Sequence, residues 1–393
     1  MESQANLTCQ NLPTIFSSFV DTFVDFSVSG GLFLPPPTIT SSSHPLQTIF
    51  PSPTRLIAIG DLHGDFQKSK QAFKLAGLID DHDKWCGGST TVVQIGDVLD
   101  RGGEELKILY FLEKLNREAV KVNGNVITMN GNHEIMNIDG DFRYVTKEGL
   151  KEFQDWGFWY CVGNDMKMLC HGLGKDCVKD IFDGIPFEFR GVKREDVDMI
   201  RIRIAALRPK GPISERFLAK NQTVVVVGDS VFVHGGLLPK HVEYGFEKVN
   251  EEVRDWICGV KGRVPRDLVR GRNSIVWLRK FSNELAKDCD CATLEHVLAT
   301  IPGVKRMIMG HTIQESGING VCNNQAIRID VGMSKGCTNG LPEVLEIDRD
   351  KGLRILTSNP LYQNEKDRFD ATPKDGLGLL LPELGPRQVE VKA

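Results

Sequence analysis

The chain has 393 residues, of which 41% are hydrophobic and 25% are charged, an ordinary balance for a globular protein. This composition excludes a largely disordered, collagen-like or coiled-coil protein, and at about 150 residues per domain the length predicts two or three domains. The 48 basic and 52 acidic residues give a net charge of −4, so we do not expect a nucleic-acid-binding protein.

The N-terminal segment, residues 1–54, differs from the rest. Residues 26–54 carry no formal charge, but Gly, Pro and Ser interrupt them. No window gives the ~20 mostly apolar residues that a membrane span needs. The basic residues of a secretory signal or transit peptide are also missing. We therefore expect a cytoplasmic protein that is not an integral membrane protein. The alternative location is the mitochondrial intermembrane space, or another organelle that needs no cleavable basic presequence.

Residues 13–28 predict an amphipathic helix, with two acidic residues, Asp21 and Asp25, on the side opposite the apolar one. The apolar residues at helical spacing are Phe16, Phe19, Val20, Phe23 and Val24. We expect this helix to dock on the body of the same chain, with a partner protein or a membrane surface as the alternatives. Residues 35–53 are rich in Pro and Ser and predict a linker.

From Arg55 onward, short apolar runs end in small clusters of Gly, Asp, His or Asn, which is typical of buried strands. These runs cover residues 56–61, 92–97, 126–134, 230–236, 305–311 and 326–332. Helical patterns at 67–78 and 104–116 lie between them, so we expect an α/β fold. One catalytic domain would cover residues 55–360. Within it, the charged, amphipathic residues 141–222 predict a mostly helical insertion beside or over the site. Residues 361–393 would form a C-terminal arm.

Potential metal ligands follow five of the predicted strands, in the motifs GDLHG, GDVLDRG, GNHE, HGG and GHT. They are Asp61, His63, Asp97, Asp100, Asn132, His133, His234 and His311. Carboxylate, imidazole and amide groups without thiolates suit Mn, Fe or Zn better than Ca or Cu(I). These ligand-type residues exceed what a single open catalytic site needs, which favours two ions over one, and two ions about 3.5–4 Å apart can clamp a phosphoryl group.

The competing interpretation treats each motif separately. A lone Gly-Asp after a strand is usually a turn, and a lone strand-end histidine usually belongs to the core. We interpret five other histidines in that way: His44, His82, His171, His241 and His296. Because five strand ends of one sequence all present metal-ligand types, we prefer the metal site.

The five motifs, in this order, resemble the signature of the phosphoprotein phosphatase family of calcineurin-like metallophosphoesterases, and the resemblance spans residues 55–350. Within that family, the chain resembles the Shewanella-like phosphatases of plants. That second resemblance rests on the long segment between GNHE and HGG, and on NIDGDFRYV at 137–145, ALRPKGP at 206–212 and IDVGMS at 329–334. The implied fold is an α+β sandwich with a central β-sandwich flanked by helices.

The resemblance also implies a role for each motif residue. Asp61 and His63 would hold the first metal, Asp97 would bridge both, and Asn132, His234 and His311 would complete the second. His133 would be the general acid, oriented by Asp100. Arg101 would bind the phosphate, together with Asn132 and a second arginine, for which Arg279 and Arg143 are the candidates. The nucleophile would be a hydroxide that bridges two divalent ions, which we expect to be manganese, with iron or zinc as alternatives.

The expected function is hydrolysis of phosphoserine and phosphothreonine in phosphoprotein substrates. A dinucleoside polyphosphate hydrolase and a phosphotyrosine phosphatase are the alternatives on the same fold. A non-enzymatic scaffold is disfavoured because none of the ligand residues is replaced.

The ten cysteines are too few for a disulfide scaffold, and no CxxC pair predicts a structural zinc site. Cys289 and Cys291 are two residues apart, which favours free thiols over a metal clip or a redox switch. Together with Cys337 they nevertheless suggest redox control as a hypothesis.

One departure from the phosphoprotein phosphatase family generates a prediction. Eukaryotic members carry a SAPNYC-type loop after the GHT motif, which binds natural-product toxins, whereas the corresponding residues here read IDVGMSKGCTNG. We expect weak sensitivity to okadaic acid and microcystin in an assay of the purified enzyme. Inhibition at nanomolar toxin would contradict this prediction.

Overall fold

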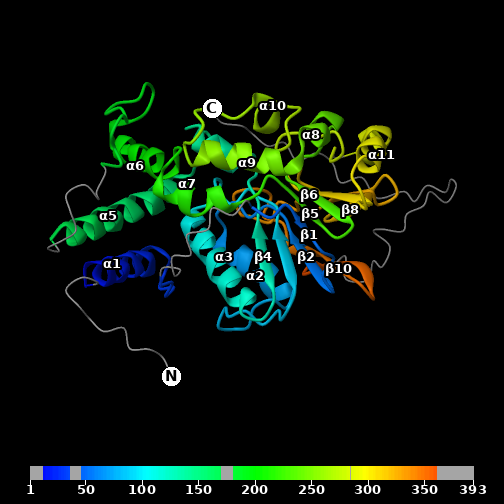
Figure 1. The fold of residues 1–393 in the computed structure, drawn as a ribbon, viewed down its shortest axis with the longest axis horizontal. Helices are drawn as coiled ribbons and strands as arrows, with labels where there is room; N and C mark the ends of the chain where they lie inside the picture. The colour runs from blue at the N-terminus through cyan, green and yellow to red at the C-terminus, as the bar shows by residue number, and fades with distance from the viewer. Residues whose placement is uncertain (1–11, 36–45, 170–179, 284, 361–393) are drawn as a thin grey trace.

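The computed structural model describes residues 12–35, 46–169, 180–283 and 285–360, and contains two mixed β-sheets (Figure 1). The five-stranded sheet has the order β11-β10-β2-β3-β4 and the six-stranded sheet the order β1-β5-β6-β7-β9-β8. The strands of the first sheet are β2 (Arg55–Ile59), β3 (Thr91–Gln94), β4 (Asn125–Thr128), β10 (Glu343–Asp348) and β11 (Gly352–Thr357). Those of the second are β1 (Ile49–Phe50), β5 (Val224–Val227), β6 (Ser230–Val233), β7 (Arg306–Met309), β8 (Asn319–Val321) and β9 (Ala326–Arg328).

The central strands are apolar because they are covered on both faces. All four residues of β5 and of β6 are buried, and strands of both sheets contribute to one continuous apolar core. β2, β3 and β4 are parallel to one another, and so are β6, β7 and β9. These six strands correspond to the six predicted runs. The expected fold class, α/β with two β-sheets flanked by helices, is confirmed.

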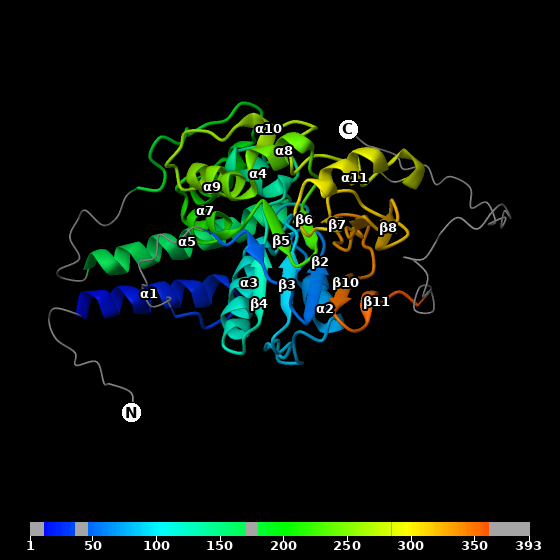
Figure 2. The ribbon, with the colours of Figure 1, turned by 45° about the vertical axis from the view of Figure 1, so that its right-hand side comes forward.

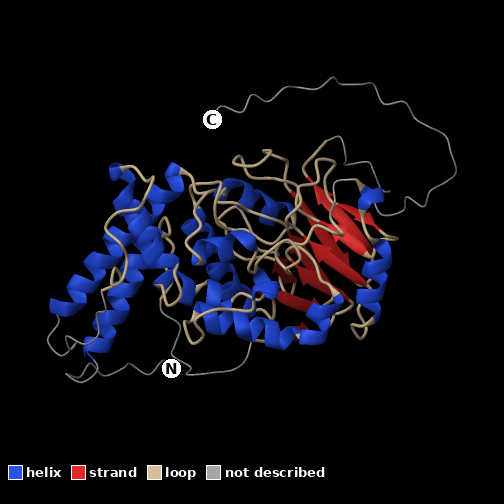
Figure 3. Ribbon diagram, turned by 90° about the horizontal axis from the view of Figure 1, so that it is seen from above, coloured by secondary structure: helices blue, strands red, loops and turns tan. Residues whose placement is uncertain are grey.

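Helices lie around the sheets (Figure 3). The predicted helices at 67–78 and 104–116 correspond to α2 (Phe66–Leu75) and α3 (Glu105–Val120). α2 begins where it does because the side chain of Asp65 accepts a hydrogen bond from the Lys68 amide, at 3.1 Å. The run predicted as a strand over 126–134 differs: it ends at Thr128, and α4 (Asn132–Ile138) begins within the GNHE motif. The helices between β6 and β7 are α8 (Pro239–Tyr244), α9 (Phe246–Ile257), α10 (Arg266–Val269), η4 (Ala286–Asp288) and α11 (Cys291–Ala299).

The segment 141–222 is mostly helical where it is described. Its helices are α5 (Lys147–Leu169), η2 (Arg194–Asp196), α6 (Val197–Leu207), α7 (Pro212–Arg216) and η3 (Leu218–Lys220). α5 and α6 pack closely, because a Cβ added at Gly157 would lie only 2.7 Å from Cγ2 of Ile202. The amphipathic segment expected at 175–184 lies in part outside the described residues, which resume at residue 180.

The N-terminal helix α1 (Leu12–Val28) lies alongside α5, as both ribbon views show (Figures 1 and 2). Its contact residues Val20 and Val24 are buried, and Gly163 of α5 leaves room for Val24. The helix therefore docks on the same chain, as expected. We expected Asp25 on the side of the helix opposite the apolar one, and this prediction is wrong. The carboxylate of Asp25 is buried, and it accepts hydrogen bonds from the Tyr110 hydroxyl at 3.0 Å and from Arg216 at 2.6 Å, which make its burial possible.

Two further features differ from the sequence-based expectations. Residues 49–50, inside the expected linker, form β1, which pairs in parallel with β5 and extends the six-stranded sheet. Cys291 is not a free thiol but forms a disulfide with Cys322, 31 residues away, a partner that local spacing does not reveal.

Burial raises the pKa of the Cys337 thiol to about 12, which disfavours a reactive thiolate there. Residues 36–45 and the expected arm at 361–393 lie outside the described residues.

Among the residues that the structure describes, no helix combines the length and the apolar character that crossing a bilayer requires.

The buried Asp25–Arg216 pair generates a stability prediction. Asp25→Ala removes one of the two carboxylates that pair with Arg216 and leaves the buried Tyr110 hydroxyl without its acceptor, so it should lower the free energy of unfolding by about 2 kcal/mol in urea denaturation. The control is Asp21→Ala on the same helix, because the Asp21–Lys167 ion pair is half exposed and should contribute less than about 1 kcal/mol. Equal effects of the two substitutions would contradict the assigned role of Asp25.

Candidate metal centre and active site

The predicted ligands converge because they follow parallel strands. β2, β3 and β4 of one sheet and β6, β7 and β9 of the other end at the same place, where a site is expected in such sheets. The residues gathered there after the six strands are Asp61 and His63, Asp97 and Asp100, Asn132 and His133, His234, His311 and Asp330. Each of them is at most 7% exposed.

Asp97 lies at the centre of this cluster. Its Oδ2 is 3.1 Å from Nε2 of His234, 3.7 Å from Nε2 of His63 and 3.8 Å from Nε2 of His133. Two groups of potential ligand atoms share this residue, and within each group all atoms lie within 4.8 Å of one another. The groups are His63, Asp97 and His133, and Asp97, His234 and His311. The geometry thus places Asp97 between two candidate cation positions.

The backbone around the centre is strained. Positive φ angles, which are uncommon for residues other than glycine, occur at His63 (45°), Asp97 (53°), Asp100 (69°), Arg101 (63°) and His311 (67°). Such conformations cost of order 1–3 kcal/mol each and cluster at functional sites. The glycine of GNHE is required by space as well, because a Cβ at Gly131 would lie 2.2 Å from Oδ1 of Asp97.

Two histidines are oriented by backbone carbonyls. Nδ1 of His63 is 3.0 Å from the carbonyl oxygen of Leu99, and Nδ1 of His234 is 3.0 Å from that of Ile95. A hydrogen bond from Nδ1 leaves Nε2 directed at the centre, the arrangement usual for metal-binding histidines. Nε2 of His311 is buried and has no hydrogen-bond partner among the described residues.

The carboxylates are crowded and buried. Burial raises the pKa of Asp61 well above its ordinary value, and the charge of Asp330 raises it further. Burial also raises the pKa of Asp330. Burial acts in the same direction on Asp97, but His234 and His133 outweigh it, so that its pKa lies well below the ordinary value. Divalent cations fit this donor set, because they would offset the carboxylate charges and take up the unpartnered imidazole nitrogen.

His133 and Asp100 form a close pair, with 2.6 Å between Nδ1 and Oδ2. Burial alone would lower the pKa of His133, but Asp97 and the hydrogen bond to Asp100 raise it above the ordinary value. The ring of Tyr144 lies 5.1 Å from that of His133 and 4.9 Å from the Arg101 guanidinium, whose Nε is unpartnered among the described residues. An imidazole and a guanidinium group therefore flank one side of the centre.

The two candidates for the second phosphate arginine are placed differently. Arg279 donates hydrogen bonds to the carbonyl oxygen of His311 at 3.0 Å and to Oγ1 of Thr312 at 2.8 Å. Arg279 is exposed, but these two hydrogen bonds hold it against the centre, and the charges of Asp330, Asp61 and Asp97 act on its guanidinium. The side chain of Arg143 is 66% exposed and paired with Asp141 at 2.6 Å. Arg279 thus has direct contacts with a predicted ligand loop, whereas Arg143 is engaged by Asp141.

Three residues at the centre were missed from the sequence. Asp330 follows β9 in the same way that the predicted ligands follow their strands, and its position in the run AIRIDVG was the available signal. Tyr144 and Arg203 belong to the 141–222 segment, which no strand pattern connects to the site. Glu134 of GNHE was missed as well. Its buried carboxylate supports the loops of the centre by accepting hydrogen bonds from the amides of four residues: Asp97, Val98, Leu99 and Gly131.

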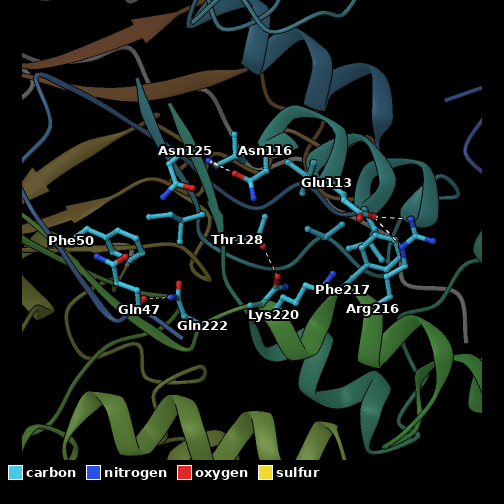
Figure 4. A pocket seen from close by; sticks show the side chains of 16 residues that line it. Gln47, Phe50, Glu113, Asn116, Asn125, Thr128, Arg216, Phe217, Lys220 and Gln222 are labelled. Atoms are coloured by element: carbon cyan, nitrogen blue, oxygen red, sulfur yellow. Dashed lines mark hydrogen bonds and ion pairs between the residues drawn. The ribbon is translucent and has the colours of Figure 1, made fainter. Parts of the chain in front are cut away.

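A separate cavity of about 300 Å³ lies beside β4, between α3 and the segment 216–222 (Figure 4). Its polar rim includes Glu113 and Arg216, which are already paired with each other at 3.0 Å. None of the converging strand-end residues lines it, so we assign it no part in the chemistry of the centre.

Over part of its length the chain is similar to the calcineurin-like phosphoesterases. The family model with that description matches residues 54–201. Among solved structures, a cold-active protein tyrosine phosphatase of a psychrophilic Shewanella species is similar, with a TM-score of 0.56 and 20% identity over 83% of this chain and 87% of that one. A point mutant of a cold-active protein tyrosine phosphatase gives a TM-score of 0.59, also at 20% identity, over 82% of this chain and 86% of that one.

The curated relatives make the assignment narrower. The chain is 67% identical over 387 residues to Shewanella-like protein phosphatase 2 of Arabidopsis thaliana, which covers 98% of this chain and 97% of that protein. It is 29% identical to Shewanella-like protein phosphatase 1 of Plasmodium berghei, over 77% of this chain and 74% of that protein. The chain belongs to the Shewanella-like protein phosphatases, and it is a phosphatase.

The unpartnered imidazole of His311 generates a prediction about metal binding. His311→Asn should lower the metal content of the purified protein and reduce kcat/KM by on the order of 100-fold, because even the loss of an outer-shell partner typically costs 10–100-fold. Elemental analysis and a phosphate-release assay measure the two effects. The matched control is His296→Asn on α11, which is exposed, contrary to the core position expected for it, and should leave both unchanged. A His311→Asn protein with the wild-type metal content would contradict the assignment.

Proposed function

We propose that the protein is a dinuclear, metal-dependent phosphoprotein phosphatase. The observation that carries this proposal is the sharing of Asp97 by two groups of buried ligand atoms at the meeting point of six strand ends. One shared carboxylate with imidazoles on both sides is the arrangement that a two-metal hydrolytic site requires.

Six residues would hold the two ions: Asp61, His63, Asp97, Asn132, His234 and His311. His133 belongs to one of the two groups of ligand atoms but would act as the general acid instead, and the motif resemblance adds Asp61 and Asn132. The ions, manganese by preference and iron or zinc as alternatives, would supply Lewis-acid polarisation of the phosphoryl group and an activated water. Hard oxygen donors mixed with imidazoles suit any of these three metals.

The chain itself binds and orients the phosphate. The planar guanidinium of Arg101 matches two phosphate oxygens, and Arg279 offers a second fork from the other side of the centre. Hydrogen bonds to His311 and Thr312 fix Arg279, and the ring of Tyr144 limits the movement of Arg101. Binding by both arginines would direct the scissile bond toward His133.

His133 would donate a proton to the leaving oxygen. Its Nδ1 is held by Asp100 at 2.6 Å, so the second ring proton is carried on Nε2, the nitrogen that faces the centre. Burial lowers the pKa of His133, but the charge of Asp97 and the hydrogen bond to Asp100 raise it above the ordinary value, a shift toward the protonated imidazole that a general acid needs.

The next question is which phosphorylated side chain the protein hydrolyses. The resemblance to the phosphoprotein phosphatase family favours phosphoserine and phosphothreonine. Two observations favour phosphotyrosine as a second candidate. Tyr144, 39% exposed, lies beside His133, and Trp277 packs edge-on against His311 with 5.6 Å between ring centres, so aromatic rings border the centre on two sides. The similar cold-active structures, one of them from a Shewanella species, are also named as tyrosine phosphatases.

The test is a single panel with the purified protein and added manganese, assayed on phosphoserine, phosphothreonine and phosphotyrosine peptides and on a dinucleoside tetraphosphate. We expect metal-dependent phosphate release from at least one peptide class and none after chelation. Comparison among the peptides decides between the two candidates. His133→Asn should lower kcat on the preferred peptide by about 100- to 10,000-fold, the usual contribution of a general acid. Hydrolysis confined to the dinucleotide would overturn the proposed function.

A further inference from the structure

Arg203 is a fully buried arginine that the chemistry described above does not use. It lies on α6, in the helical 141–222 segment, and its side chain reaches the strand-end loop that carries Asp100. Nη2 donates to Oδ1 of Asp100 at 3.2 Å and to Oε2 of Glu105 at 2.6 Å. Nη1 donates to Oε1 of Glu105 at 3.1 Å. A buried charge of this kind is costly unless its partners are well placed.

The two oxygens of Asp100 have separate partners as a result. Oδ1 accepts hydrogen bonds from Arg203 and, at 2.9 Å, from Nδ2 of Asn137. Oδ2 faces Nδ1 of His133 at 2.6 Å. Asn137 is itself fixed, because its Oδ1 accepts a hydrogen bond from Nε of Arg203 at 2.9 Å. The carboxylate therefore cannot rotate about its own axis without breaking bonds to Arg203 and Asn137.

The guanidinium is also held from its faces. It stacks 4.4 Å from the ring centre of Phe153 on α5 and lies 5.7 Å from that of Phe142. Glu105, its bidentate partner, is the first residue of α3 and follows the loop that carries Arg101. The helical segment is thus connected to both the His133–Asp100 pair and the phosphate-binding loop through one side chain.

We propose that Arg203 is a positioning residue for proton transfer to the leaving group. By holding Asp100, it keeps the His133 imidazole in the orientation from which Nε2 reaches the leaving oxygen. This inference rests on the proposed function, because it assigns His133 the part of general acid. Arg203 does not touch the substrate. Lysine cannot replace it, because a single ammonium group cannot serve Asp100, Asn137 and both oxygens of Glu105 together.

The experiment compares aryl phosphates that differ in how much the leaving oxygen needs a proton. For phenyl phosphate protonation is important, whereas 2,4-dinitrophenolate leaves as a stable anion. We expect Arg203→Lys to lower kcat on phenyl phosphate by about 10- to 100-fold, part of the effect of a general acid. On 2,4-dinitrophenyl phosphate we expect a loss of less than about threefold, with metal content unchanged. The matched control is Arg201→Lys on the same helix, whose guanidinium stacks on Phe187 at 4.4 Å and should show neither effect.

Equal losses on the two substrates, or no loss on either, would overturn the proposal, since a merely structural residue does not discriminate between leaving groups. If Arg203→Lys does not fold, Glu105→Gln carries the test: it loosens Arg203 without removing it, and should give the same discrimination on a smaller scale. Failure of the proposed function can be told apart from failure of the proposal for Arg203. If His133 is not the general acid, His133→Asn in the otherwise wild-type protein will lower kcat on phenyl phosphate and on 2,4-dinitrophenyl phosphate to the same extent.

Discussion

The structure depends on the burial of Asp97 among imidazoles at the point where six strands end. A carboxylate in such a place is strongly destabilised unless opposite charges and hydrogen bonds compensate it. The surrounding chain provides them: Nε2 of His234 lies 3.1 Å from Oδ2, the His133 amide donates to Oδ1, and Glu134 binds the Asp97 amide. The positive φ angles nearby are the conformational cost of bringing these groups within reach.

Two layers of support surround this centre. The inner layer consists of the sheets, whose parallel strands fix where the ligand-bearing loops begin. The outer layer is the helical segment 141–222, which contributes Tyr144 at the rim and Arg203 beneath Asp100. α1 packs on α5 of that segment, and Asp25 binds Arg216, so the N-terminal helix belongs to the same packed body.

The sequence was sufficient for the features that depend on strand ends. Glycine, aspartate and histidine at the ends of short apolar runs predicted the fold class and residues that the structure gathers around Asp97. It was insufficient wherever a helix supplies the side chain, because helical spacing does not indicate which distant loop a residue such as Arg203 will reach. The prediction for Asp25 was wrong for the same reason. Helical periodicity separates polar from apolar sides, but it does not show that a cation elsewhere in the chain, here Arg216, will pair with Asp25 in the folded protein. The Cys291–Cys322 disulfide likewise joins positions that only the folded chain brings together.

If Asp97 holds two ions at once, as proposed, the metal content of Asp97→Asn should reveal it. The asparagine keeps the size of the side chain and removes its charge and one ligand oxygen. Elemental analysis of the manganese-loaded wild-type protein should give about two ions per chain, as a two-metal site requires. The variant should retain at most one. A variant that keeps the full complement of metal, or a wild-type protein that never binds a second ion, would contradict the account.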